Sequence, residues 1–307
     1  MIFKGGSFTA TSLVSFISGI GGAFVEMVIF QILVGLSTAM LYWVVSVGLT
    51  FIFGVTRVLN FAHGSFYMLG AFFTLTLFKW TNNFVLSAAL GSLAVGIIGL
   101  LCERGVIRFT YSLPVAFQLV LTFGLVLIFE DLVRFTWGSV PQMMQPLGLG
   151  TVMVAGRRFP IYSFIVMGIG LSLWIILYFL LLKTKLGLMI RATISDIELA
   201  MANGINPHLL YSFSFFFGSL LAGLGGAITL PMCSASLGMG ERIIIYSFII
   251  TVMGGLGNIK GAFISSLIIG VSESLCALFA PGLTIAISYI ILAMILVVKP
   301  EGIYGEA

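Results

Sequence analysis

The feature that most constrains this chain is the length of its uncharged apolar runs. Residues 159–182 form a stretch of 24 residues without a charge, and about 20 apolar residues suffice for a helix to cross a bilayer. Charged residues make up only 8% of the chain, against roughly 25% in a soluble domain. Such runs also exclude a membrane β-barrel, whose strands alternate over about 10 residues. The sequence therefore predicts an all-α polytopic membrane protein.

Breaks in the hydropathy pattern predict eight or nine transmembrane helices, some of them short or broken. The glycine content favours close packing and broken helices, because 37 of the 307 residues are Gly and Gly lets neighbouring helices approach closely. The run 243–255 is too short for a full crossing of about 20 residues. The expected apolar runs are residues 27–53, 64–78, 83–101, 113–133, 159–182, 208–231, 243–255, 262–279 and 283–298.

The segments outside these runs complete the predicted organisation. Residues 1–26 are rich in Gly and Ser, and because they lack an A-x-A cleavage site we expect an interfacial segment rather than a signal peptide. Residues 27–300 form the expected transmembrane domain, and residues 301–307 form a C-terminal tail. Residues 136–158 read as an external loop with a small hairpin, and residues 183–208 as a cytoplasmic loop. With this topology, slightly more of the 14 basic residues fall inside than outside, as the positive-inside rule predicts.

Composition and motifs exclude several classes of protein. The net charge of +4 is spread over short loops, which argues against a nucleic-acid partner. Cys102, Cys233 and Cys276 are widely spaced and form no metal or redox motif. The sequence contains no nucleophile elbow or H-E-x-x-H motif, so we expect neither an enzyme nor a cofactor. It also contains no G-x-x-x-x-G-K-[ST] phosphate loop, so any energy for transport must come from a partner or an ion gradient.

Two similar elements indicate an internal repeat of two halves. Residues 60–64 (Asn-Phe-Ala-His-Gly) lead into a helix that contains Gly70, and residues 258–261 (Asn-Ile-Lys-Gly) lead into one that contains Gly270. Each element follows an apolar run that ends in Gly. Such repeats occur in transporters, although Asn and Gly at a helix start are also ordinary capping residues.

The cytoplasmic loop contains an amphipathic segment. Ile190, Ile194, Ile197 and Met201 fall on one stripe of a helix of about 15 residues, which is too short and too polar to cross a bilayer. Two interpretations stay open. The helix either lies at the membrane interface against its own subunit, or it inserts its apolar stripe into a groove on a partner.

The end of this segment follows the rules of helix termination. Gly204 predicts a left-handed stop, and Ile205 is placed for the hydrophobic contact that accompanies it. Asn206 and Pro207 then supply a helix cap and a first-turn proline for the next helix.

Three motifs carry a resemblance to a known family. Residues 187–206 contain the pattern R-A-x-x-x-D-x-x-x-A-x-x-x-G-I-N. Residues 48–55, followed by residues 60–71, form the second motif, and residues 254–262 (Gly-Gly-Leu-Gly-Asn-Ile-Lys-Gly-Ala) form the third. In this order the motifs resemble those of branched-chain amino acid ABC transporter permeases of the LivH type, over most of the chain from about residue 28 to 300.

The resemblance implies a transport subunit with several partners. Such a permease works with a second, homologous permease, two ATP-binding subunits and an extracytoplasmic solute-binding protein, in the cytoplasmic (inner) membrane of a bacterium or archaeon. The implied substrates are small polar solutes, such as branched-chain or other amino acids, and residues 27–300 would be the permease domain, surrounded by membrane lipid.

The same resemblance implies which residues transmit the energy of ATP. In this family the cytoplasmic helix docks in a cleft of the ATPase and moves as a lever. Ala192 and Ala200 would permit close approach, while Arg191 and Asp196 would pair with charges on the partner. Gly204 would fix the exit turn. The implied ATPase-coupling residues are Arg191, Ala192, Asp196, Ala200 and Gly204.

Four polar residues within or beside the expected spans are candidates for the translocation path or for broken helices. Asn60 and Asn258 stand where a helix break would leave free backbone groups to satisfy. His63 would line a pore, cap a helix or pack near the cytoplasmic end. Glu273 lies in the middle of a span, and both a structural hydrogen-bonded carboxylate and one that lines the path fit its position.

Two further charged groups have alternative interpretations. Glu130 and Arg134 have the i, i+4 spacing of a local ion pair, but Glu130 would also suit a proton-coupling carboxylate. An ion-coupled secondary transporter that uses Glu130 or Glu273 is therefore the alternative function. A short cytoplasmic patch, expected to be solvated or bound to lipid headgroups, is formed by Glu103, Arg104 and Arg108.

Overall fold

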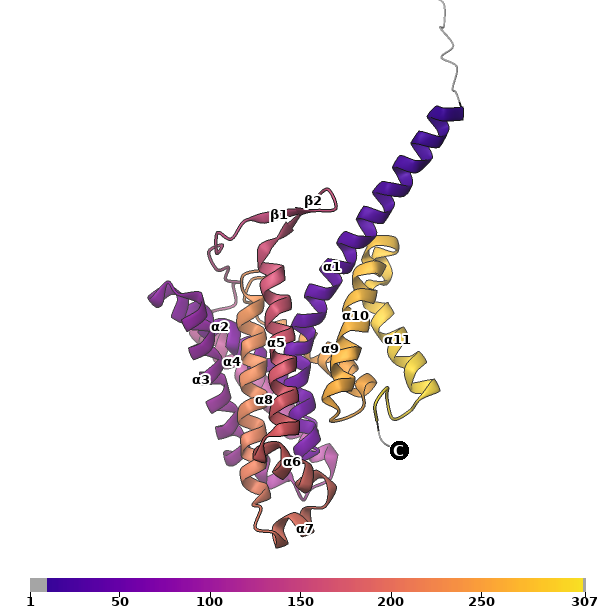
Figure 1. Ribbon diagram of the computed structural model, residues 1–307. Helices are drawn as coiled ribbons and strands as arrows, with labels where there is room; N and C mark the ends of the chain where they lie inside the picture. The colour runs from indigo at the N-terminus through magenta and orange to yellow at the C-terminus, as the bar shows by residue number, and fades with distance from the viewer. Residues whose placement is uncertain (1–9, 306–307) are drawn as a thin grey trace, which may run out of the picture.

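The computed structural model describes residues 10–305, and for residues 10–21 and 23 it describes the backbone alone. The described chain is a bundle of helices with one small β-hairpin, which confirms the all-α fold (Figure 1). The elements are α1 (Ala10–Thr56), α2 (His63–Thr81), α3 (Phe84–Gly105), η1 (Ile107–Thr110), α4 (Val115–Trp137), β1 (Thr151–Val154), β2 (Arg157–Pro160), α5 (Ile161–Lys183), α6 (Lys185–Ser195), α7 (Ile197–Ala202), α8 (Pro207–Thr229), α9 (Met239–Gly254), α10 (Ile259–Phe279), η2 (Pro281–Leu283) and α11 (Thr284–Val298).

Seven helical segments in the described part of the chain are long and apolar enough to cross a membrane. Helices α2 and α9 are not among the seven, although most of their residues are buried inside the bundle. They are the short elements that the sequence led us to expect among eight or nine spans. The seven segments are Phe24–Thr56, Phe84–Gly105, Val115–Trp137, Ile161–Lys183, Pro207–Thr229, Ile259–Phe279 and Pro281–Val298.

Helix α2 begins partway through the bundle. The imidazole Nε2 of His63, its first residue, hydrogen-bonds the carbonyl of Val45 at 2.9 Å. Val45 precedes the end of α1 at Thr56 by about three helical turns, roughly 16 Å at 1.5 Å per residue. The connection between α1 and α2 therefore returns into the bundle, and this non-helical backbone is enclosed by protein.

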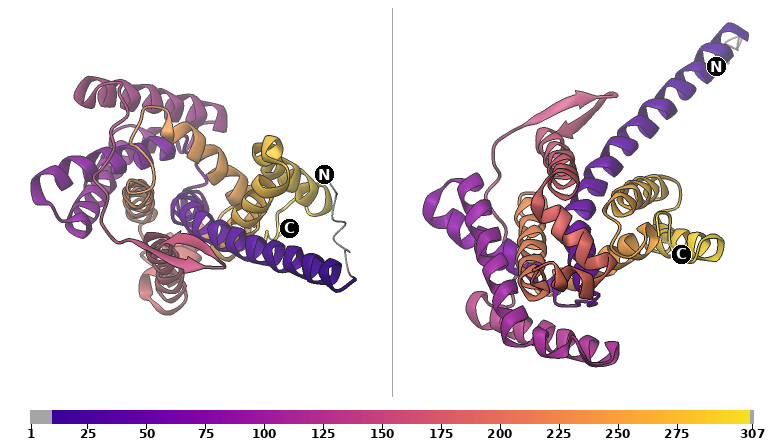
Figure 2. Two further views of the ribbon diagram at one scale, coloured as in Figure 1. Left: turned by 90° about the horizontal axis from the view of Figure 1, so that it is seen from above. Right: turned by 60° about the horizontal axis from the view of Figure 1, so that its bottom comes forward.

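The helices are arranged around α1 and α8. Helices α2, α3 and α4 lie on one side of the molecule, and α10 and α11 lie on the other (Figures 1 and 2). The β1–β2 hairpin, in which Thr151 pairs with Pro160, lies at one end of the bundle, and α6 and α7 lie at the opposite end. The small hairpin predicted for the loop of residues 136–158 is thus present, at residues 151–160. The two long loops lie at opposite ends of the bundle, as an alternating topology requires.

Glycine permits the closest helix crossings. A Cβ atom on Gly70 of α2 would overlap the backbone of Gly223 in α8, and one on Gly226 would overlap the carbonyl of Tyr67. Small residues at such crossings let helix backbones touch, which supplies much of the packing energy within a membrane. Nearby, the buried indole of Trp43 in α1 donates a hydrogen bond of 3.1 Å to the carbonyl of Gly170 in α5.

The two ends of the chain lie partly outside the described residues. Residues 1–9, within the expected interfacial segment, and residues 306–307 are not described. From Ala10 the backbone is helical without a boundary near residue 26. The described part of the tail folds back on α9, because the amides of Ile303 and Tyr304 donate to the carbonyls of Met253 and Gly254 at 2.8 and 3.1 Å.

Candidate functional site

The segment of residues 183–208, predicted to be cytoplasmic, forms two helices rather than one. Asp196 has an extended backbone (φ −155°, ψ 107°) between α6 and α7, and its carboxylate accepts a hydrogen bond of 2.9 Å from the amide of Leu199. This is the geometry of an N-cap residue, which favours the start of a new helix. The predicted continuous helix of about 15 residues is therefore wrong.

The predicted apolar stripe has a buried part and an exposed part. Ile190 in α6 is 2% exposed and packs in a small core with Phe51 and Val55 of α1 and Leu210 of α8. From Ile194, near the end of α6, and on through α7, several apolar side chains are exposed. This exposed group, which we call the apolar tip, consists of Ile194, Ile197, Leu199 and Met201.

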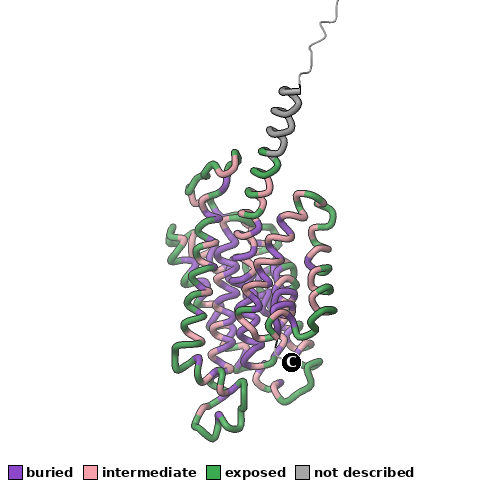
Figure 3. The backbone as a smooth tube through the Cα atoms, turned by 45° about the vertical axis from the view of Figure 1, so that its right-hand side comes forward, coloured by how far each residue is buried: buried purple, intermediate pink, exposed green. Residues whose placement is uncertain are grey.

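The apolar tip lies at the end of the bundle, where Figure 3 shows a largely exposed loop below the buried centre. Leu199 is 62% exposed and Met201 is 50% exposed. The carboxylates of Asp196 and Glu198 are exposed beside them. A patch of apolar side chains rimmed by charge is typical of a surface that binds another protein.

The exit from α7 follows the predicted stop signal. Gly204 has φ +81°, and the amide of Ile205 donates to the carbonyl of Ala200 at 3.1 Å. Ile205 packs against the core around Ile190, as the motif requires. The side chain of Asn206 accepts from the amide of His208 at 3.0 Å and so caps α8, which begins at Pro207.

The five residues implied by the resemblance do not share one surface. The Arg191 guanidinium points back toward α5 and donates to the carbonyl of Leu181. Ala200 is buried and Ala192 is half-buried, whereas Asp196 and Gly204 are exposed. The structure thus places Ala200 in the packing of the segment, the exposed Arg191 against the end of α5, and Asp196 and Gly204 at the two turns.

A cavity of about 400 Å³ lies between part of α6 and the neighbouring helices. It is lined by Ile190, Arg191 and Ile194 of α6, together with residues of α1, α5 and the start of α10 that include Gly54 and Asn258. A helix that is closely packed on all sides cannot move without displacing its neighbours. The open space beside α6 therefore leaves this helix freer to shift than a helix in the core.

Asn60 and His63 are both fully buried at the start of α2. His63 bonds to α1 through Nε2, while its Nδ1 and both polar atoms of the Asn60 amide have no hydrogen-bond partner among the residues that the structure describes. Asn60 is not the cap of α2, because the residue before the helix is Ala62. Buried polar atoms of this kind are usually satisfied by ordered water.

Asn258, the counterpart of Asn60 in the predicted repeat, does cap its helix. Its side-chain oxygen accepts from the amide of Gly261 at 3.0 Å, and its amide group donates to the carbonyl of Tyr304 at 2.8 Å. The two glycine motifs also meet in space, since a Cβ atom on Gly54 would lie 3.1 Å from the Cα of Gly257.

Glu273 is nearly buried between α10, α1 and α11. Its carboxylate accepts hydrogen bonds from the hydroxyl of Tyr42 at 2.9 Å and from Ser288 at 2.7 Å. Tyr246 stacks on Tyr42, with ring centroids 4.7 Å apart. Both carboxylate oxygens therefore have partners on neighbouring helices, which fits the structural interpretation of this residue.

The predicted ion pair between Glu130 and Arg134 is wrong. Arg134 pairs instead with Asp131, at 2.9 Å and with both side chains exposed. The i, i+3 and i, i+4 positions both reach Arg134 on a helix, and here the nearer carboxylate binds it. Glu130 instead borders a cavity of about 250 Å³ together with Glu241 of α9.

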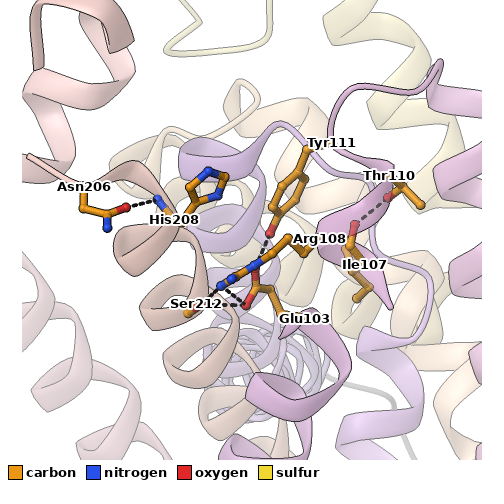
Figure 4. Close-up of polar contacts among 8 residues, drawn as sticks. All are labelled: Glu103, Ile107, Arg108, Thr110, Tyr111, Asn206, His208 and Ser212. Carbon is orange, nitrogen blue, oxygen red and sulfur yellow. Dashed lines mark hydrogen bonds and ion pairs between the residues drawn. The ribbon is translucent and has the colours of Figure 1, made fainter. Parts of the chain in front are cut away.

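Sequence reasoning missed a buried polar cluster at the C-terminal end of α3. Glu103 is fully buried rather than solvated, because it accepts hydrogen bonds from Arg108 Nε at 3.2 Å, Tyr111 Oη at 3.0 Å and Ser212 Oγ at 2.6 Å (Figure 4). The expectation of a solvated patch is thus wrong for Glu103. The spacing of Glu103 and Arg108 was visible in the sequence, but the approach of Ser212 was not. We call these four residues the Glu103 cluster.

Tyr111, which follows η1, acts only as a donor in this cluster. Burial, followed by the nearby Glu103 carboxylate, raises the pKa of its hydroxyl far above the ordinary value of 10.0. Among residues 10–305, no group of three or more His, Cys, Asp or Glu side chains is placed to hold a metal ion. The polar chemistry of this region is therefore that of hydrogen bonds and one buried ion pair.

Comparison with known proteins places the chain among membrane transport components. Residues 31–299 match the family model described as "Branched-chain amino acid transport system / permease component". The chain is 30% identical to a probable branched-chain amino acid transport permease protein LivH of Methanocaldococcus jannaschii, over 85% of this chain and 87% of that one. It is 27% identical to the high-affinity branched-chain amino acid transport system permease protein BraD of Pseudomonas aeruginosa, over 90% and 95%. A structure of PsaBC from Streptococcus pneumoniae in complex with Fab aligns with a TM-score of 0.49 and 13% identity, over 88% and 92% of the two chains.

Proposed function

Since the chain belongs to the family of permease components of branched-chain amino acid transport systems, we propose that it is the transmembrane subunit of an ABC importer. The observation that carries this proposal is the α6–α7 segment, which exposes the apolar tip at one end of the bundle. The segment is too short to cross a membrane, and its exposed apolar side chains suit a groove on a partner. The proposed partner at this surface is an ATP-binding subunit.

The geometry suggests how the segment would act. When the ATP-binding subunits close, they would displace the apolar tip, and the turns at Asp196 and Gly204 would keep α7 in a fixed orientation. The cavity behind α6 leaves room for that displacement. Movement would then pass to α8, which begins directly after the segment at Pro207, and to α1, which contacts Ile190.

The proposed complex contains further subunits. A second, homologous permease would complete the translocation path, two ATP-binding subunits would supply the energy, and an extracytoplasmic protein would deliver the solute. The names of the relatives favour branched-chain amino acids as substrates, within the wider class of small polar solutes. The proposed location is the cytoplasmic membrane of a bacterium or archaeon, where membrane lipid surrounds the apolar faces.

A charge placed in the apolar tip tests the proposal. Leu199→Asp replaces a 62% exposed apolar side chain with a carboxylate, which an apolar groove on a partner disfavours. We therefore expect at least about a tenfold loss of ATP-binding subunits that co-purify with the variant. A factor of ten in binding corresponds to 1.4 kcal/mol. Leu199→Met at the same position keeps an apolar surface and is the matched control.

Uptake into proteoliposomes separates the importer from an ion-coupled carrier. For the wild-type complex we expect uptake that requires ATP and persists when proton and sodium gradients are dissipated. Uptake that proceeds without ATP and stops when the ion gradient is dissipated would refute the importer and favour a carrier that uses Glu130 or Glu273.

A further inference from the structure

The Glu103 cluster joins three parts of the chain at the cytoplasmic end. Glu103 belongs to α3, Arg108 to η1 and Ser212 to α8, and Tyr111 follows η1 directly. The Ser212 hydroxyl donates to Glu103 at 2.6 Å and accepts from Arg108 at 2.8 Å. One serine of α8 is therefore bonded to both members of the ion pair that closes the α3–η1 turn.

On one side, the cluster is connected to the α6–α7 segment. Ser212 lies less than two turns after Asn206, the residue that caps α8 where the cytoplasmic segment ends. The ring of Tyr211 packs edge-on against Tyr111, with centroids 5.0 Å apart, and against His208 at 6.1 Å. A displacement of the first turns of α8 must therefore act directly on Glu103 and Tyr111.

On the other side, the cluster is connected to α4 and to the start of α2. Gln118 in α4 donates to the carbonyl of Thr110 at 3.1 Å, and Thr110 is the residue before Tyr111. One turn further along α4, the Thr122 hydroxyl, which donates to the carbonyl of Gln118 in its own helix at 2.9 Å, lies 3.5 Å from the carbonyl of Leu59. Leu59 belongs to the connection that carries Asn60 into the bundle.

We propose that the Glu103 cluster is a joint that transmits movement of the α6–α7 segment through α8 to α3, α4 and the broken start of α2. This inference rests on the proposed function, because the movement is that of an ATP-driven importer. Glu103, Arg108 and Ser212 are positioning residues, since they act through the helices that they connect.

The chemistry of the cluster fits this role. Glu103 is fully buried and Arg108 is 34% exposed, and a buried ion pair gives little net stability compared with apolar residues of the same volume. Charge-assisted hydrogen bonds do provide fixed directions and distances. The bonds of Ser212 therefore fix the position of the first turns of α8 relative to the end of α3.

The number of ATP molecules hydrolysed per solute transported tests the joint. It is measured with the complete complex in proteoliposomes for Ser212→Ala, which removes both bonds between α8 and the ion pair. We expect hydrolysis within about twofold of the wild-type rate and about a tenfold increase in ATP used per solute, which corresponds to 1.4 kcal/mol of lost coupling. Ser214→Ala is the matched control, because the buried Ser214 hydroxyl bonds only to the carbonyl of Leu210 in its own helix.

The outcomes separate transmission from simple stability. If the Ser212→Ala complex hydrolyses the wild-type number of ATP molecules per solute, the proposed joint is refuted. The same holds if ATP hydrolysis, uptake and melting temperature all fall while that number is unchanged. If Ser212→Ala does not assemble, Tyr211→Leu decides by the same ratio, because it removes the ring contact with Tyr111 and leaves Glu103 paired. Wild-type uptake that needs no ATP would instead refute the proposed function.

Discussion

The cap at Asp196 can be separated from its charge by two substitutions. Asp196→Ala removes the acceptor for the Leu199 amide, which costs about 1 kcal/mol at an N-cap. Because α7 has only 6 residues, it is too short to be stable as an isolated helix, and the loss lowers its folded fraction about fivefold relative to the frayed state. Asp196→Asn keeps a side-chain oxygen of nearly equal capping strength and loses only the negative charge.

Two measurements distinguish the cap from the charge: hydrogen exchange of the α7 amides and ATP-driven uptake. In the complete complex we expect the amides of α7 to exchange about fivefold faster in Asp196→Ala than in the wild-type protein, with ATP-driven uptake reduced by at most the same factor. Asp196→Asn should match the wild-type protein in both measurements. Loss of uptake in Asp196→Asn with unchanged exchange would refute this reasoning, because the charge rather than the cap would then be the functional feature.

Two glycine substitutions test the exit turn of α7 and the packing of the C-terminal tail on α9. Gly204→Ala forces a side chain into a left-handed conformation (φ +81°), which costs roughly 1–2 kcal/mol. We expect this variant to hydrolyse more ATP per solute transported. An unchanged number of ATP molecules per solute would show that the exit turn of α7 plays no part in coupling. Gly302→Ala would bring a Cβ within 2.6 Å of the Gly255 amide nitrogen and displace the tail from α9, so we expect the melting midpoint to fall by about 2–4 °C for each kcal/mol lost. Gly282→Ala is the control, because Gly282 has open space around it. Equal melting midpoints for the two variants would contradict a stabilising role of the tail.

The features that sequence predicted well depend on local chemistry. The membrane spans follow from apolar length, and the exit from α7 follows from Gly204, Asn206 and Pro207, whose effects reach only neighbouring residues. The break at Asp196 was also local, but its cap competes with a continuous apolar stripe. The sequence alone does not decide that competition, because helix propensity and capping differ by only about 1 kcal/mol.

The features that sequence reasoning missed depend on contacts between distant residues. Glu103 and Ser212 are 109 positions apart, so no spacing rule relates them, and an apolar span ending in charge looks the same whether or not α8 approaches it. The tail on α9 is similar, since Tyr304 bonds to Asn258 across 46 positions. The ATPase-coupling roles of the cytoplasmic residues stay predictions that the experiments above decide.

The position of α2 has a consequence for how the protein enters the membrane during synthesis. This helix is not among the segments apolar enough to partition into lipid alone, and it starts beside the middle of α1. Only Asn82 and Asn83 separate α2 from the strongly apolar α3. We therefore expect the two helices to insert into the membrane together, as one helical hairpin. The buried polar residues Asn60 and His63 at the start of α2 are thus carried into the bilayer by neighbouring helices, not by an affinity of α2 for lipid.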